Sequence, residues 1–229
     1  MTLEQRIAQV NESIAEACKR AGRSPEEVNV VAVTKYVSAE MTGKVLDSGV
    51  EHIGENRWQT ARPKWEALGD RGTWHFIGQL QSNKVKDIIG KFAYIHSLDR
   101  LSLARELERQ AAAADIKIKA FVQVNISGEE SKSGMLPEET FEFMRRMRDF
   151  PHIDAIGLMT MAPLDGEAEA ARPVFRGLRE LKDRLNASGE PAKPLEHLSM
   201  GMSGDFEVAI EEGATWVRLG SILVGKEED

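Results

Sequence analysis

Short apolar segments alternate with longer amphipathic segments along the whole chain, and this alternation restricts the fold more than any other feature. The apolar segments are rich in β-branched residues, as buried strands are. We expect strands at residues 28–34, 51–53, 73–77, 92–96, 117–125, 153–158, 195–199 and 215–219. The helices expected between them cover 39–48, 57–68, 82–89, 101–114, 138–150, 167–186 and 205–212, after an N-terminal helix over residues 3–21.

Strands separated by helices must pair in parallel, because neighbouring parallel strands need a long crossover connection. Eight such units close a (β/α)₈ barrel, for which about 250 residues is typical, and this chain has 229. No linker rich in proline, glycine or serine divides the chain, so residues 1–229 are expected to form a single α/β domain, a TIM barrel with an extra N-terminal helix. A doubly wound open sheet is the alternative, and the strand count favours the barrel.

The composition argues against several classes of protein. A net charge of −7 is unlike that of proteins that bind the phosphate backbone of nucleic acids. The single cysteine, Cys18, excludes an internal disulfide and indicates a reducing compartment. The sequence has neither an apolar run of membrane-spanning length nor an N-terminal signal segment, so we expect a cytoplasmic, soluble protein.

Lys35 follows the first apolar segment, where a charged side chain needs a partner or a chemical role. If the strand continued to Lys35, alternation would place its side chain on the same face as Val31 and Val33, aimed into a pocket above the strand. Burial disfavours an ammonium ion and makes a better amine, as in lysines that form Schiff bases. The alternative is a strand-end lysine that reaches solvent, and the segment alone supports both interpretations equally.

The loops after the last two expected strands contain the small residues Gly201, Ser203, Gly204, Gly220 and Ser221. Backbone N–H groups can approach an anion closely at such residues, and this end of the barrel is a frequent phosphate site. The alternative is that Ser203 and Asp205 simply cap the following helix. An amine at one end and a phosphate site at the other suit pyridoxal 5′-phosphate (PLP), and equally a phosphosugar with a carbonyl group.

Motifs spread in order over nearly the whole chain resemble those of the pyridoxal phosphate homeostasis protein family. They include Val33-Thr34-Lys35, Gly54-Glu55-Asn56 and Arg218-Leu219-Gly220-Ser221, with further blocks at 74–84, 96–99, 124–126, 132–134, 157–161 and 198–203. The resemblance implies a barrel like the N-terminal domain of alanine racemase, the PLP fold type III, with PLP held as an aldimine on Lys35. The residues that it places around the cofactor are Asn56, Ser199, Met200, Arg218, Gly220 and Ser221.

Within that set, the resemblance assigns the phosphate to Ser199, Gly220 and Ser221, and it places Arg218 opposite the pyridine nitrogen. An arginine can only donate hydrogen bonds, so Arg218 would face an unprotonated nitrogen. Such a ring is a poor electron sink, which argues against the carbanion chemistry of transaminases. Asn56 and Met200 are implied as neighbours of the cofactor.

Racemisation by two bases needs an acid–base group on the cofactor face opposite Lys35. The chain has two tyrosines. We expect Tyr36 to point away from the pocket toward the helices, because it follows Lys35 directly. Tyr94 and His75 are expected to be core residues with satisfied partners.

The sequence therefore favours a non-catalytic protein that stores, buffers or delivers PLP. We expect a monomer that contacts PLP-dependent apo-enzymes transiently, with Arg57, Lys84 and Lys132 near the rim of the pocket to guide a phosphorylated ligand. The alternatives are a weak PLP-dependent amino-acid racemase and, less favoured, a Schiff-base aldolase.

Overall fold

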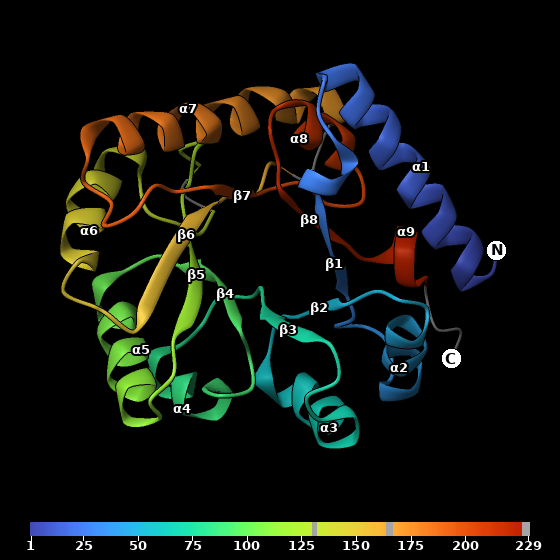
Figure 1. Cartoon of the computed structure of the whole chain (residues 1–229), viewed down its shortest axis with the longest axis horizontal. Coiled ribbons are helices and arrows are strands. Elements are labelled where there is room, and N and C mark those ends of the chain that lie inside the picture. The colour runs from blue at the N-terminus through green and yellow to red at the C-terminus, as the bar shows by residue number, and fades with distance from the viewer. Residues whose placement is uncertain (130–131, 164–166, 226–229) are drawn as a thin grey trace.

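Parallel pairing of the first and last strands closes the sheet into a barrel of eight strands, in chain order (Figure 1). The structure is a computed structural model that describes residues 1–129, 132–163 and 167–225. The predicted TIM barrel is confirmed. Its strands are β1 (Asn29–Val33), β2 (His52–Glu55), β3 (Thr73–Phe76), β4 (Tyr94–Leu98), β5 (Ile118–Gln123), β6 (Ile153–Met159), β7 (His197–Ser199) and β8 (Trp216–Leu219).

Helices follow the strands and cover the outside of the barrel (Figure 1). They are α2 (Ala39–Asp47), α3 (Trp58–Leu68), α4 (Val85–Ile88), α5 (Leu101–Ala113), α6 (Thr140–Met147), α7 (Arg172–Ser188), α8 (Phe206–Glu211) and α9 (Ser221–Val224), after the N-terminal helix α1 (Leu3–Ala21). Short 3₁₀ turns occur at Pro25–Glu27, Ser82–Lys84, Pro137–Glu139 and Ala168–Ala171. No helix in the described ranges is both long enough and apolar enough to cross a membrane.

Two apolar clusters form the core, one on each side of the sheet. Along β1, alternation sends Ala32 into the large cluster between strands and helices and Val31 into the barrel interior. The inner cluster joins Val31 to Phe121, Met159 and Trp216. Because both faces of a parallel sheet are buried, the strands read as nearly continuous apolar runs. The alternation of such apolar runs with amphipathic segments is the pattern that predicted the barrel.

The extra helix α1 fastens the segments that follow β7 and β8. Its first turn is capped by Thr2, and it ends at Gly22, whose φ of 65° favours glycine. The Arg6 guanidinium donates 2.9 Å to the carbonyl of Leu223 in α9, and Arg20 pairs with Glu211 of α8 at 2.6 Å. The helix thus supports the two loops in which the sequence predicted a phosphate site.

Several predicted boundaries are wrong. The first strand ends at Val33, so Thr34 and Lys35 lie outside it, and Lys35 occupies a turn. The fourth strand begins at Tyr94 rather than 92, and the helix predicted over 82–89 is a 3₁₀ turn followed by the short α4. Sequence reasoning also missed α9, which begins directly after Gly220.

Candidate functional site

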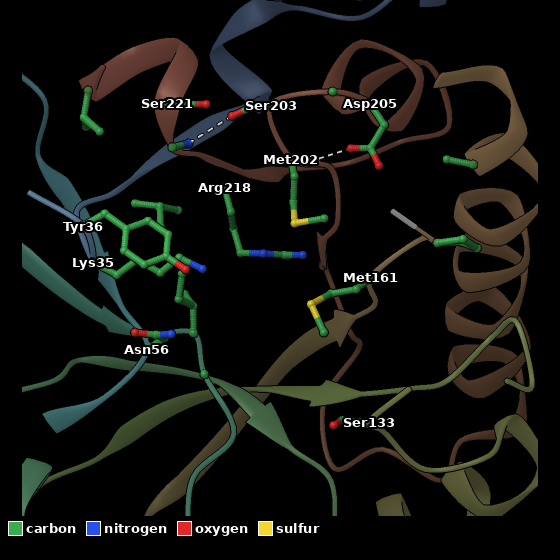
Figure 2. Close-up of a pocket in the computed structure, with 18 of the residues that line it drawn as sticks. Lys35, Tyr36, Asn56, Ser133, Met161, Met202, Ser203, Asp205, Arg218 and Ser221 are labelled. Atoms are coloured by element: carbon green, nitrogen blue, oxygen red, sulfur yellow. Dashed lines mark hydrogen bonds between the residues drawn. The ribbon is translucent and has the colours of Figure 1, made fainter. Parts of the chain in front are cut away.

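A cavity of about 970 Å³ opens at the carboxyl ends of the strands (Figure 2). This is the end at which active sites of this fold lie. The cavity brings together five of the residues predicted for the site: Lys35, Asn56, Arg218, Gly220 and Ser221. In Figure 2, Lys35 lies on one side of the cavity, Arg218 extends into its middle, and Met161 and Met202 lie on the far side.

The turn that carries Lys35 is fixed through its neighbour Thr34. The Thr34 hydroxyl donates 2.6 Å to the carboxylate of Glu55, and its carbonyl accepts from the ammonium of Lys64 at 2.5 Å. The backbone N–H of Thr34 donates to the carbonyl of Gly54 at 3.1 Å. Lys35 itself is half-buried and lines the cavity. Hydrogen bonds therefore hold the residue before Lys35, while the Lys35 side chain lies at the cavity.

The predicted orientation of Tyr36 is wrong. Because β1 has already ended, the alternation of a strand does not apply, and Tyr36 lines the mouth of the cavity with 84% of its surface exposed. The ammonium of Lys35 lies 4.8 Å from the centroid of the Tyr36 ring, within the range of a cation–π contact. Tyr36 is therefore on the same side of the cavity as Lys35.

Arg218 is a buried cation in the cavity wall, with 4% of its surface exposed. Its guanidinium donates 2.5 Å to the hydroxyl of Ser199 and 3.0 Å to the carbonyl of Thr160. No carboxylate among the described residues forms an ion pair with it. Burial lowers the pKa of Arg218 to about 10, against the opposing effect of Asp205. The guanidinium stays charged at neutral pH and can only donate hydrogen bonds.

Ser199 and Met200 are the two predicted site residues that do not line the cavity. Both side chains are fully buried, Ser199 beneath Arg218 and Met200 within the apolar core. The Ser199 hydroxyl is also 2.8 Å from Nδ1 of His96. Ser199 therefore contacts the cavity through Arg218 rather than directly.

The loops after β7 and β8 come together at one end of the cavity, as the phosphate prediction requires. The Ser203 hydroxyl accepts from the N–H of Gly220 at 3.2 Å, and Asp205 accepts from the N–H of Met202 at 2.6 Å (Figure 2). Neither side chain caps α8, so the alternative reading of this loop is wrong. Within the described ranges, no hydrogen bond uses the backbone N–H of Ser203, Gly204 or Ser221. These donors remain available to an anion.

Asp205, which directly follows Ser203 and Gly204, also lines the cavity. Burial raises its pKa, against the effects of the hydrogen bond from Met202 and of the charge on Arg218. The cavity wall also contains residues that the sequence did not assign to the site, among them Val33, Ile77, Gln123, Met161 and Met202. Four of them lie in the motifs that carry the family resemblance, and Gln123 could have been indicated only by its position at a strand end.

The remaining predictions concern the rim and the core. Arg57, Lys84 and Lys132 do not line the cavity, and Lys84 lies 4.0 Å from Asp87. His75 is fully buried and hydrogen-bonded to other histidines, as predicted for a core residue. The described part of the chain shows no group of His, Cys, Asp or Glu arranged to hold a metal ion.

Comparisons with known proteins agree with this architecture. Residues 7–228 match the family model described as alanine racemase, N-terminal domain. The pyridoxal phosphate homeostasis protein of Aquifex aeolicus is 45% identical over 223 residues, which are 97% of each chain. PipY of Synechococcus elongatus, solved with PLP bound, superimposes with a TM-score of 0.85 at 32% identity and covers 98% of this chain and 100% of its own.

Alanine racemase of Clostridium difficile shares the fold with a TM-score of 0.72 at 18% identity, and this chain covers 55% of its length. That likeness extends to architecture alone, whereas the relatives of 32% and 45% identity match from end to end. The chain belongs to the pyridoxal phosphate homeostasis protein family and has the fold of the alanine racemase N-terminal domain.

Proposed function

We propose that the cavity binds PLP through Lys35, and that the protein serves PLP homeostasis by storing, buffering or delivering the cofactor. The observation that carries this proposal is the pairing of Lys35 with Arg218. Both cations face one cavity, and neither forms an ion pair within the described residues. A chain of net charge −7 has ample carboxylates to neutralise them. Because neither cation has a carboxylate partner, the cavity favours an anionic ligand that supplies the negative charge.

The donor set suits PLP at both of its ends. Lys35 offers an amine that can condense with an aldehyde, and the backbone N–H groups of Ser203, Gly204 and Ser221 are uncommitted donors for a phosphate. Arg218 can donate to an unprotonated ring nitrogen. The two relatives described above carry PLP in their names or as a bound ligand, which supports the same assignment.

When bound, PLP supplies a reactive aldehyde and a ring that can accept electrons. The residues of this chain favour holding the group over using it. Arg218 keeps a positive charge beside the ring, where a carboxylate would promote electron uptake. Across the cavity from Lys35 lie the thioether side chains of Met161 and Met202 and the carboxylate of Asp205, which accepts a hydrogen bond from the backbone N–H of Met202 (Figure 2). Neither thioether can act as an acid or a base.

A weak amino-acid racemase is the second candidate, because Tyr36 proves to line the cavity mouth. Its ring lies beside the Lys35 ammonium, however, whereas a two-base racemase needs its second group on the opposite side.

The exposed aromatic ring of Tyr36 at the cavity mouth is also consistent with delivery of PLP to another protein. We propose that a PLP-dependent apo-enzyme contacts this mouth transiently.

A spectroscopic titration tests PLP binding. Adding PLP to the purified protein should give a saturable new absorbance band, and Lys35→Arg should abolish that band while keeping the positive charge. Inorganic phosphate should compete with PLP for the wild-type cavity and so reduce the band. A band of equal intensity and affinity in Lys35→Arg would refute the assignment of Lys35.

A further inference from the structure

A column of hydrogen-bonded side chains runs through the inside of the barrel beneath the cavity. It begins at His52, the first residue of β2, whose Nδ1 lies 3.0 Å from Nε2 of His75. Nδ1 of His75 lies 2.9 Å from Nε2 of His96, and Nδ1 of His96 lies 2.8 Å from the Ser199 hydroxyl. Arg218 completes the column by donating to that same hydroxyl oxygen. The column connects the amino-terminal end of the barrel with the cavity wall.

The histidines of the column are neutral. His75 and His96 are fully buried, and burial holds both pKa values well below the ordinary value, aided by the charges of neighbouring groups such as Lys119 and Arg218. The ring of Tyr94 stacks on His75 with centroids 4.3 Å apart. His52 is only half-buried, so this end of the column approaches solvent.

The barrel interior of this fold is normally filled with branched apolar side chains. Polar rings in such an interior are unfavourable unless each donor and acceptor is satisfied. The column satisfies every ring nitrogen of His75 and His96. A fully connected polar chain that ends on a cavity residue indicates a role beyond filling space.

The direction of the hydrogen bonds follows from Arg218. Its guanidinium can only donate, so the Ser199 oxygen accepts from it. Ser199 is fully buried, and among the described residues its O–H proton has an acceptor only if it points to Nδ1 of His96. His96 then carries its proton on Nε2 and donates to His75. His75 therefore accepts at Nδ1, carries its proton on Nε2 and donates to Nδ1 of His52. His52 in turn carries its proton on Nε2.

We propose that His52, His75 and His96 are positioning residues that hold Ser199 as the acceptor for Arg218, and that Arg218 in turn fixes the tautomer of every histidine in the column. The two ends of the barrel are coupled through this column. The coupling is a property of the protein without ligand. Its effect on PLP rests on the proposed function, because it acts through the placement of Arg218 in the cavity wall.

Nitrogen-15 NMR of the histidine rings, recorded on the protein without added ligand, tests the coupling. His52, His75 and His96 should all carry their proton on Nε2 at neutral pH. Arg218→Met lets the Ser199 hydroxyl accept as readily as donate, so the Nδ1–H tautomer should become populated as far away as His52. Arg218→Lys retains a side chain that only donates and should keep the wild-type tautomers. An unchanged His52 in Arg218→Met, or Nδ1–H rings in the wild type, would overturn the proposal.

A second variant guards against misfolding of Arg218→Met. His75→Phe interrupts the column, so His96 should keep the Nε2–H tautomer while the Nδ1–H tautomer becomes populated at His52. Loss of the His96 tautomer as well, in a protein that remains folded by circular dichroism, would contradict the directional argument. His152 lies outside the column and pairs with Glu108 at 2.7 Å, and His152→Gln is the matched control for removing a histidine.

The effect on the ligand is measured by titration with PLP. His96→Leu removes the acceptor for the Ser199 proton and should weaken PLP binding about tenfold, the value of one hydrogen bond. His96→Asn places an acceptor near the position of Nδ1 and should restore most of the affinity. Equal weakening in both variants would mean that His96 only fills space. If the wild type binds no PLP, the proposed function fails, and the NMR result still decides the coupling.

Discussion

The ammonium nitrogen of Lys64 lies 2.7 Å from a carboxylate oxygen of Glu55, and the two side chains are 7% and 0% exposed. Both also bind Thr34, the residue before Lys35. A buried ion pair therefore fixes the turn from which the proposed imine-forming lysine extends. The pair also gives Lys64 a carboxylate partner, whereas Lys35 forms no ion pair among the described residues and contacts only the ring of Tyr36. Of these two lysines, only Lys35 is left to react with an aldehyde.

Breaking this pair should destabilise the protein strongly. Lys64→Met leaves the buried carboxylate of Glu55 without a cation and should lower the free energy of unfolding by about 3–5 kcal/mol. The double variant Lys64→Met/Glu55→Leu removes both charges, so its free energy of unfolding should fall less than that of Lys64→Met. Urea denaturation measures both. As a control, Arg62 pairs with Glu66 at the surface, where solvent screens the pair, so Arg62→Met should change the free energy of unfolding little. A double variant as unstable as the single one would contradict the assignment.

Gly78 permits the close approach that places Asn56 at the cavity. A Cβ atom at Gly78 would lie 2.2 Å from the carbonyl oxygen of Asn56, so Gly78→Ala must displace that strand end. We expect weaker PLP binding and a loss of stability of about 1–3 kcal/mol. In α2, a Cβ at Gly43 would meet its nearest neighbour at 3.4 Å, so Gly43→Ala should be tolerated. Equal behaviour of the two variants in binding and thermal unfolding would count against this role of Gly78.

Mild acid should destabilise the protein through its buried histidines. Because burial lowers the pKa values of His75 and His96 below 6.5, the unfolded chain binds protons that the folded chain does not. The free energy of unfolding should therefore fall as the pH drops below 6.5, by about 1.4 kcal/mol per pH unit for each such group. His75→Gln should reduce this slope by the contribution of one histidine. An unchanged slope in His75→Gln would contradict the assignment.

The carrier interpretation predicts little catalysis. With PLP and L-alanine in deuterated water, exchange of the α-proton should be no faster than with PLP and free amine. Tyr36→Phe should leave that rate unchanged, since Tyr36 lies beside Lys35 rather than across from it. Proton NMR follows the exchange directly. Steady turnover that disappears in Tyr36→Phe would instead favour the racemase.

The alternation of apolar and amphipathic segments was sufficient to predict the barrel, and the barrel brought Lys35 and Arg218 to one cavity. The exact end of β1 was not predictable in this way. Lys64, which is 30 residues away in sequence, binds the carbonyl of Thr34 where the strand stops. The wrong orientation of Tyr36 follows from that error. Local patterns do not contain a contact made by a distant helix.

The resemblance to a family placed Ser199 at the phosphate, whereas the structure places it beneath Arg218. The partner that accounts for this position, His96, is 103 residues away in sequence. The sequence predicted that His75 is a core residue with satisfied partners, but the order of the column depends on the stagger of β2, β3 and β4 around the barrel. Pairing register is set by the closed fold and is not readable from one strand.

The attachment of PLP to Lys35 is tested most directly by borohydride reduction followed by peptide mass spectrometry. After incubation with PLP and reduction, the peptide that contains Lys35 should gain the mass of the reduced PLP adduct. Peptides that contain Lys64, Lys84 or Lys132 should remain unmodified under the same conditions. Modification spread evenly over surface lysines, with the Lys35 peptide unchanged, would contradict the account.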